Sequence, residues 1–530
     1  MKGMIINIKR QKCKWIMLFV FSLYTLLTSW ISDDAYHAFI MAKNLVDGHG
    51  FVYNVGYRVT ASTCPLFTLF TALFYFFFRN IYLTGVILGV LFSTLAVYII
   101  IFKVCSKNVT ALLSVCILVC CYSFMSFATS GLENSLLYLE AALFLLLLMN
   151  NQVYKEKDLL ALALVLSFIA MTRMDAVLVF VPTICMVYLF YTGVKFGKRV
   201  VIGLCGLLPF IVWELFSIIY YGFPFPNTMY IKLNTGFSKI EYYKRGIEYV
   251  FHSSVADVLL LVVPLLFVIS SILQKSKKLI MVACGVVLYE AYVIAIGGDF
   301  MLGRHMTLPF LVSLVGLIYI FNEKEVICDT KRMTLERVLI VILAIGVFGG
   351  YSMQLEKSKI YGGMGDEKMY YYPYTGFLNY LVSHIDGEDS VSWYYIDYFQ
   401  KDVKEIQSTN AKGGCLVNGL AGIAQYYAQE EKTLCLSDSY GLMDPLLSHL
   451  PAVWTENWRV GHMRREIPVG YNESLATGTN QIADKSLHDF YDKVLIITQG
   501  NLWDIDRLKV IINMNLGKYD YLIDEYLSVQ

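Results

Sequence analysis

The sequence predicts a polytopic α-helical membrane protein with about eleven transmembrane helices, followed by a C-terminal α/β extracytoplasmic domain. Three observations lead to this prediction. The chain of 530 residues is 57% hydrophobic and has a mean hydropathy of +0.55. Only 16% of its residues are charged, whereas soluble domains carry about 25%. Long apolar runs fill the chain up to residue 351, after which the composition turns polar. The formal net charge of +1 gives no reason to expect a nucleic-acid partner.

Eleven apolar segments approach or reach the length of about 17–25 residues that a transmembrane helix needs. The first follows the basic stretch MKGMIINIKRQKCK and has no small-residue cleavage site. We therefore expect an uncleaved first helix with its N-terminus in the cytoplasm. The segments are residues 14–30, 81–104, 109–127, 134–149, 157–173, 176–193, 199–221, 254–273, 278–296, 307–321 and 334–350.

The additional apolar run CPLFTLFTALFYFFF, residues 64–78, decides the topology. Leaving it out of the count of spans places every basic loop in the cytoplasm, as the positive-inside rule requires. We therefore expect a re-entrant or interfacial helix at 64–78, inside a first extracytoplasmic loop at 31–80; the alternative is an ordinary span. The basic loops are KVCSK (103–107), YKEK (154–157), KFGKR (195–199), KSKK (275–278) and the pair Lys331 and Arg332.

This topology divides the chain into a transmembrane domain, residues 1–351, and a soluble extracytoplasmic domain, residues 352–530. In the second domain, strand-like pieces such as GCLVNGL and KVLIITQG alternate with helical pieces such as FLNYLVSHI, which predicts an α/β fold. Cys415 and Cys435 are candidates for a disulfide that closes a loop of about twenty residues. The many aromatic residues of this domain suit either its core or the faces of sugar rings.

Five polar clusters interrupt the apolar runs, all at the extracytoplasmic ends of predicted helices. Ionisable residues at membrane depth are costly and by default line an interior or a water-filled cavity. We therefore expect the clusters to build one outward-facing site rather than five unrelated helix caps. The clusters are SDDAYH (32–37), SGLENS (130–135), TRMDA (172–176), FPFPNTMYIK (223–232) and GGDFMLGRH (297–305).

The residue types in these clusters fit the transfer of a group to a hydroxyl. The adjacent acids Asp33 and Asp34 offer a general base, and the cations offer stabilisation for a departing phosphate. The alternative for the acid pair is a cap of the following helix. The chain has no nucleotide-binding glycine-rich loop, so the energy for transfer has to come with a membrane-soluble substrate. No Cys/His cluster has metal-ligand spacing, and no metal site is predicted.

The stretch DDAYHAFIMAKNLVDGHGFVYNVGYRV resembles the first-loop signature of polyprenyl-phosphate-sugar-dependent GT-C glycosyltransferases. Within that superfamily the similarity is to the mycobacterial terminal β-arabinofuranosyltransferases and to flagellar motor control proteins related to them. Two departures concern Phe39 or Met41, where relatives often have an arginine, and ASTCP (61–65), where they often show a glycine-tyrosine-threonine turn. Further similar pieces are GLE (131–133), TRMD (172–175), FPFPNTMYIK, GGDFMLGRH, LSDSYGLMDP (436–445) and WRVGHMRREIP (458–468).

The resemblance implies a GT-C-like enzyme of the bacterial inner membrane that transfers a sugar from a polyprenyl-phosphate donor to a cell-envelope glycan or glycoconjugate. Asp33 would be the general base, and Asp34 would orient the acceptor. Arg304 and Lys232 would hold the lipid phosphate, and Arg173 would either do the same or pair with Asp175. No cofactor is implied, and a need for a divalent cation stays open. The other implied substrate-binding residues are His37, Asn54, Glu133, Asn227, Asp299, His305, Asp438, Asp444, His462 and Arg464.

Two residue roles and two other functions stay open at this point. Asn54 and Asn227 either bind sugar hydroxyls or cap turns. The chain could instead be a transporter or flippase for lipid-linked saccharides, although it shows no inverted repeat. A non-catalytic assembly factor for an envelope or flagellar machine is the third possibility, and it should tolerate the loss of the acid pair.

Overall fold

The computed structural model describes most of the chain, in two compact units that are interleaved along the sequence. Unit 1 comprises residues 1–31, 85–210 and 238–378, and unit 2 comprises residues 32–84, 211–237 and 379–530. The first predicted loop thus shares a unit with the C-terminal part of the chain, and the predicted domain boundary at residue 351 stays a prediction. The described residues are 2–324, 335–353, 363–385, 404–405, 408–409, 416–418, 422–428, 436–456 and 458–529.

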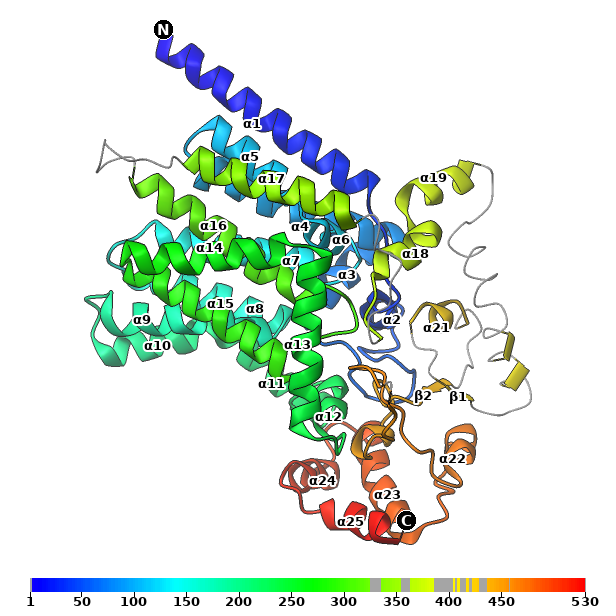
Figure 1. The fold of residues 1–530 in the computed structure, drawn as a ribbon. Coiled ribbons are helices and arrows are strands. Elements are labelled where there is room, and N and C mark those ends of the chain that lie inside the picture. The colour runs from blue at the N-terminus through cyan, green and yellow to red at the C-terminus, as the bar shows by residue number, and fades with distance from the viewer. Residues whose placement is uncertain are drawn as a thin grey trace. The chain divides into compact units, whose positions relative to one another are not determined.

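Unit 1 is helical and is built around α16 (Thr307–Lys324), which packs against α14 (Leu259–Gln274), α7 (Asn134–Met149) and α15 (Lys277–Ala295). The side chains of α16 are apolar on almost every face and buried between residues 306 and 318, as expected of a central helix. These helices lie side by side in Figure 1. The other elements are α1 (Lys2–Leu27), most of α4 (Ile81–Ile99), the π-helical turn η1 (Ile100–Val104), α5 (Asn108–Cys120), α6 (Tyr122–Phe127), α8 (Glu156–Thr172), η2 (Asp175–Val179), α9 (Val181–Phe190), α10 (Phe196–Gly206), α13 (Lys239–Ala256), η3 (Arg304–Met306), α17 (Leu335–Met353) and α18 (Glu367–Thr375).

Outer helices of unit 1 expose large apolar side chains. Leu265, Ile269 and Ile272 on α14 are more than half exposed, and Val201 and Leu204 on α10 are exposed to the same degree. Exposed apolar surface of this extent marks a face that contacts lipid or protein. The pattern agrees with the membrane environment that the composition predicts.

Fewer helices are long enough to span a bilayer than the eleven expected. By length and composition, Ile81–Val104 and Lys277–Ala295 qualify among the described residues, and two bent helix pairs raise the number to at most four. Six shorter apolar helices have 10–17 residues, or about 15–26 Å of helix against a hydrocarbon core of about 30 Å. The apolar runs are interrupted by local backbone breaks: the predicted span 109–127 is divided at Cys121, whose φ of −77° and ψ of 100° are extended.

Unit 2 gathers the first loop, the segment 211–237 and the C-terminal helices. In the first loop, α2 (Ala35–Val46) packs on α3 (Pro65–Phe78). At the C-terminus, α23 (Lys485–Gln499) packs on α24 (Ile505–Asn515) and α25 (Asp520–Val529), as seen in Figure 1. The expected helix at 64–78 is confirmed as α3; its re-entrant placement stays a prediction. The other elements are most of α11 (Leu208–Tyr220), α12 (Asn227–Leu233), most of α19 (Phe377–Ile385), β1 (Leu416–Asn418), α21 (Ile423–Ala428), β2 (Leu436–Asp438), η4 (Leu447–His449) and α22 (Tyr471–Thr477).

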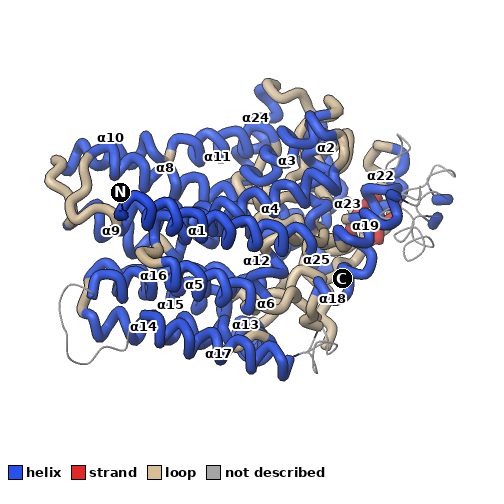
Figure 2. The backbone as a smooth tube through the Cα atoms, turned by 90° about the horizontal axis from the view of Figure 1, so that it is seen from above, coloured by secondary structure: helices blue, strands red, loops and turns tan. Residues whose placement is uncertain are grey.

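The described residues of the C-terminal part are less rich in strands than predicted. In the part of the chain that the structure describes, strand is confined to β1 and β2, the red segments of Figure 2. These two strands pair in parallel. β1 lies in GCLVNGL, and the helix predicted for FLNYLVSHI is confirmed as α19. The strand predicted for KVLIITQG is wrong, because these residues complete α23. This helix buries Leu487, Phe490, Tyr491, Val494 and Ile497, which is helical rather than alternating spacing. Cys415 and Cys435 lie outside the described residues.

Candidate functional site

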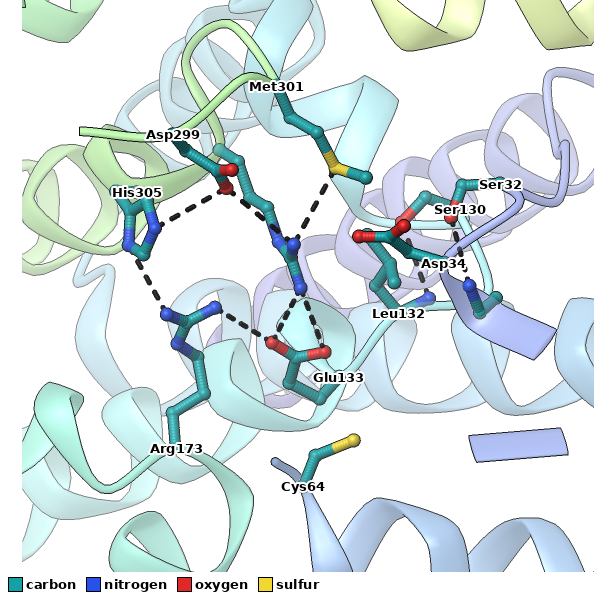
Figure 3. Close-up of polar contacts among 12 residues, drawn as sticks. Ser32, Asp34, Cys64, Ser130, Leu132, Glu133, Arg173, Asp299, Met301 and His305 are labelled. Atoms are coloured by element: carbon teal, nitrogen blue, oxygen red, sulfur yellow. Dashed lines mark hydrogen bonds and ion pairs between the residues drawn. The ribbon is translucent and has the colours of Figure 1, made fainter. Parts of the chain in front are cut away.

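Asp33 and Asp34 end the turn that leads into α2, but neither side chain caps this helix. Asp34 occupies the N-cap position and makes no side-chain cap hydrogen bond. Ser32 Oγ instead accepts a hydrogen bond from the Ala35 backbone N–H at 3.3 Å, as the dashed line beside Ser32 in Figure 3 shows. Asp34 Oδ1 lies 3.9 Å from His37 Nε2. A side-chain capping role therefore falls to Ser32 and leaves the two acids for other contacts.

The Asp33 carboxylate is held by a segment far away in the sequence. Asp33 Oδ1 accepts a hydrogen bond of 2.8 Å from the backbone N–H of Ile423, which is the first residue of α21. Asp33 Oδ2 accepts no hydrogen bond from any residue that the structure describes. Burial raises the pKa of Asp33 to about 7; the Ile423 N–H opposes this rise, and the charge of Asp34 adds to it. A carboxyl group with a pKa near the working pH and one oxygen unoccupied is suited to accept a proton.

Two more contacts connect the first loop to α21. Tyr53 Oη accepts a hydrogen bond from the Gly422 N–H at 3.1 Å, and Asn54 Oδ1 accepts one from Gln425 Nε2 at 2.8 Å. The side-chain oxygen of Asn54 thus contacts α21, and the two roles considered for this residue stay predictions. Sequence reasoning missed Tyr53, Gln425 and Ile423. A backbone donor leaves no side-chain signal, the glutamine belongs to no motif, and the tyrosine lies in the first-loop stretch without being one of its candidate residues.

The FPFPNTMYIK cluster contributes a structural tie and one cation to unit 2. Asn227 is buried, and its Nδ2 donates a hydrogen bond to the Asp444 carbonyl oxygen at 3.0 Å. Its backbone N–H donates to the Thr60 carbonyl oxygen at 3.2 Å. Lys232 lies in the last turn of α12 and is half-buried. Asn227 therefore joins three parts of the unit, while Lys232 remains a candidate for binding an anion.

The acids of the C-terminal motif hold their own loop. Asp438 accepts hydrogen bonds from the Tyr440 and Leu442 N–H groups at 2.9 and 2.8 Å. Asp444 Oδ1 accepts from the Leu446 and Leu447 N–H groups at 2.8 and 2.7 Å, and Tyr471 Oη donates to it at 2.7 Å. Both acids therefore stabilise their own loop, and their predicted substrate-binding role stays a prediction. Burial raises the pKa of Asp438 to about 7.

The buried arginine of this region is Arg465, although the sequence motif singled out its neighbour Arg464. Arg464 is exposed, whereas Arg465 is only 3% exposed. Arg465 donates to the carbonyl oxygens of Ile231 at 2.6 Å, Tyr440 at 3.0 Å and Leu450 at 3.4 Å, and also to that of Met463. The ring of His462, a predicted binding residue, lies edge-on to Tyr440 at 5.2 Å. Two adjacent arginines carry no sequence signal that tells which one is buried.

Three of the five predicted clusters meet in unit 1, where Glu133 bridges two arginines (Figure 3). Glu133 lies before α7, Arg173 ends α8, and Arg304 begins η3. Glu133 Oε1 lies 2.9 Å from Arg173 Nη1 and 3.0 Å from Arg304 Nη2, and the glutamate side chain is 2% exposed. The sequence prediction that these polar clusters assemble thus holds for SGLENS, TRMDA and GGDFMLGRH. The other two clusters belong to unit 2.

Further acids and a histidine complete this charge cluster. Arg173 pairs with Asp175 through two contacts, Nε to Oδ1 at 3.1 Å and Nη2 to Oδ2 at 2.9 Å. Asp299 Oδ2 lies 3.4 Å from His305 Nε2 and 3.6 Å from Arg304 Nη1. Three carboxylates thus face two guanidinium groups. Of the two roles considered for Arg173, pairing with Asp175 is the one observed.

One group of residues in the described part of the chain has the arrangement of a metal site. His488, Asp489 and Asp492 lie on the outer face of α23, with potential ligand atoms within 4.8 Å of one another. Asp492 Oδ1 also accepts a hydrogen bond from Asn480 Nδ2 at 2.8 Å. The group is exposed, and exposed acids of this kind are common on helices without a metal. We assign no metal role to it.

Neither a protein-family profile nor a curated protein matches the chain. Among solved structures, it is similar to ArnT from Cupriavidus metallidurans bound to undecaprenyl phosphate, with 11% identity, a TM-score of 0.42, and coverage of 80% of this chain and 88% of that chain. ArnT from the same organism in the apo state gives 11% identity, a TM-score of 0.43, and coverage of 82% and 86%. At this identity and TM-score the likeness carries no argument about family or activity.

Proposed function

We propose that this protein is a membrane-bound glycosyltransferase that transfers a sugar from a polyprenyl-phosphate donor to a hydroxyl group of a cell-envelope glycan or glycoconjugate. The observation that carries the proposal is Asp33, a half-buried carboxyl group with a pKa of about 7, one oxygen held and the other unoccupied by the described residues. The apolar outer helices and the resemblance of the first loop to GT-C enzymes support the membrane setting and the donor class.

The proposed reaction needs one proton acceptor and one stabilised leaving group. Asp33 Oδ2 takes the proton of the acceptor hydroxyl while the hydroxyl oxygen attacks the anomeric carbon of the donor sugar. The bond from this carbon to the phosphate oxygen breaks, and polyprenyl phosphate leaves with the electron pair. General-base assistance of this kind typically contributes about 10²–10⁴-fold to the rate. The acid can serve in this way because near neutral pH a good part of it is ionised.

The leaving phosphate requires cationic stabilisation. We propose Lys232, which belongs to the same unit as Asp33, as the candidate, while the predicted role of Arg304 in unit 1 stays a prediction. Lys232 is half-buried on α12, and Arg304 contacts Glu133 and Asp299 in unit 1. Arg173 and Arg304 are less suited to this role because carboxylates already pair with both guanidinium groups. We propose for Arg173 a role in holding the charge cluster together.

The test is sugar transfer by membranes that contain matched amounts of wild-type protein or Asp33→Asn. Polyprenyl phosphates with several radiolabelled sugars serve as donors, with cell-envelope glycan as the acceptor. We expect transfer from at least one donor and its near-complete loss in Asp33→Asn, which keeps the size of the side chain but removes the base. Full transfer by the variant would exclude Asp33 as the base. Movement of lipid-linked sugar across vesicles without transfer would favour a flippase.

A further inference from the structure

A turn in the C-terminal part of the chain is built against the Asp33 carboxylate. We call Gly422 and Ile423, at the start of α21, the Gly422 turn. Its two backbone N–H groups point to the first loop, one to Asp33 Oδ1 at 2.8 Å and one to Tyr53 Oη at 3.1 Å. The residues that form the first contact are 390 positions apart in the sequence. Asp33 is thus fixed by a segment that the sequence gives no reason to associate with it.

Burial and side-chain contacts of α21 hold the Gly422 turn in unit 2. Ile423 and Gln425 of α21 are almost completely buried, with exposed fractions of 0% and 3%. The rings of Tyr36 and Tyr426 meet edge to face with their centroids 5.2 Å apart, so an aromatic contact joins α2 to α21. Together with the Gln425–Asn54 hydrogen bond, these contacts hold the turn in place relative to Asp33.

The residue at position 422 has to be glycine for two separate reasons. Its φ of +93° lies in a region that residues with a Cβ rarely adopt. A Cβ built at this position would also lie 2.5 Å from Asp33 Oδ1 and 2.8 Å from Oδ2. Any side chain there would displace the carboxylate. A turn that only reversed the chain would need the positive φ of Gly422, but it would not need the close approach to both carboxylate oxygens of Asp33.

We propose that the Gly422 turn is the positioning element of Asp33: the Ile423 N–H fixes Oδ1, and Oδ2 is thereby directed to the hydroxyl group of the acceptor. This inference rests on the proposed function, since it assigns the turn a role through Asp33 as base. The turn itself touches no reacting atom. Its second effect is on the charge of the base, because a hydrogen bond from a backbone N–H favours the carboxylate form. One contact thus fixes the position of the base and also favours its ionised form.

The experiment compares Gly422→Ala with Gly478→Ala. Both glycines have positive φ, +93° and +70°, but a Cβ at Gly478 would meet no atom within 4 Å. The backbone strain of about 1–2 kcal/mol is thus common to both variants, and only Gly422→Ala presses on Asp33. We expect Gly422→Ala to lower kcat about 10- to 100-fold, the size of effect that a misplaced catalytic group produces. The midpoint of its pH–rate profile should shift to higher pH, while Gly478→Ala keeps the wild-type kcat and midpoint.

A second pair of variants covers the case in which Gly422→Ala does not fold. Ile423 is the first residue of α21, a position that accepts proline. Ile423→Pro removes the N–H donor and places the ring Cδ where the proton pointed to Asp33 Oδ1, so it both breaks the hydrogen bond and displaces the carboxylate. Ile423→Val keeps the donor. We expect the proline variant alone to lower kcat and raise the pH midpoint. The inference is overturned if Gly422→Ala or Ile423→Pro retains the kcat and midpoint of its control while Asp33→Asn is inactive. Activity in Asp33→Asn would instead refute the proposed function.

Discussion

The guanidinium group of Arg173 meets the carboxylate of Asp175 through two parallel contacts, Nε to Oδ1 at 3.1 Å and Nη2 to Oδ2 at 2.9 Å. The side chains are 14% and 15% exposed, so solvent screens this pair little. Such a two-point contact depends on the planar fork of arginine, which lysine cannot reproduce. The two roles considered for Arg173 can therefore be told apart. Binding a phosphate needs only a positive charge, whereas pairing with Asp175 needs the planar guanidinium group.

We expect Arg173→Lys to lower the thermal stability of the protein in detergent although it keeps the positive charge. Removing one partner of a buried ion pair typically costs about 3–5 kcal/mol, and lysine retains part of the interaction. The double variant Arg173→Gln and Asp175→Asn should lose less stability than the two single variants lose together. In the double variant neither residue of the pair keeps a charge that has lost its partner. Wild-type stability of Arg173→Lys together with a raised KM for the donor would instead assign Arg173 to the phosphate.

Two neighbouring arginines provide a second comparison. Arg465→Met leaves four buried carbonyl oxygens without their donor, so we expect a loss of at least about 3 kcal/mol. Arg464→Met changes an exposed residue and should stay within about 0.5 kcal/mol of the wild type. Thermal unfolding of the purified variants measures both. If Arg464 were the binding residue of this motif, its variant would lose sugar transfer with unchanged stability.

Those arginines also illustrate how far the sequence predicts the structure. Apolar runs predicted most helices correctly, because a helix that is surrounded by protein or lipid on every side is apolar over most of its length. KVLIITQG misled because its β-branched residues have strand propensity, while the helical spacing from Leu487 to Ile497 becomes clear only over a longer window. Whether Arg464 or Arg465 is buried depends in part on the Ile231 carbonyl group of α12, more than 230 residues earlier.

Membrane orientation gives a third prediction. With the re-entrant assignment of residues 64–78, the loop near Asn151 lies in the cytoplasm and the C-terminus outside. Alkaline phosphatase fused behind the C-terminus should be active in intact cells, and the same enzyme inserted after Asn151 should be inactive. The reverse pattern, or activity at both positions, contradicts the topology.

The pH dependence of transfer gives the fourth prediction. Asp33 acts as a base only when ionised, so the rate should rise with pH through about 7 and level off above it. The charge of Asp34 raises the pKa of Asp33, so Asp34→Asn should move the midpoint to lower pH. A carboxyl group with a raised folded-state pKa binds more protons folded than unfolded, so stability should fall as pH rises from about 4 to 7. A pH–rate profile that falls through 7 would contradict the assignment of Asp33.

The candidate site was only partly predictable. Asp33 was found because a pair of acids after an apolar helix is unusual, and the charge cluster was found because polar residues at membrane depth are rare. The hydrogen bond that fixes Asp33 Oδ1 was not predictable, since its donor is the backbone N–H of Ile423, 390 residues further along the chain. Long-range pairing of this kind is encoded in the packing of α2 against α21, which no local pattern reveals.

The fifth prediction separates the cap from the base at the start of α2. Ser32 Oγ accepts from the first helical N–H, so Ser32→Ala should cost about 1 kcal/mol of stability and leave the kcat of transfer unchanged. Asp34 makes no cap hydrogen bond, so Asp34→Asn should leave stability almost unchanged. If Asp34 orients the acceptor, this variant raises the KM for the acceptor more than it lowers kcat. Steady-state kinetics and melting temperatures of Ser32→Ala, Asp33→Asn and Asp34→Asn, measured on one set of preparations, resolve these roles. If the acids were caps, Asp33→Asn and Asp34→Asn would retain wild-type transfer, because asparagine caps a helix as well as aspartate does.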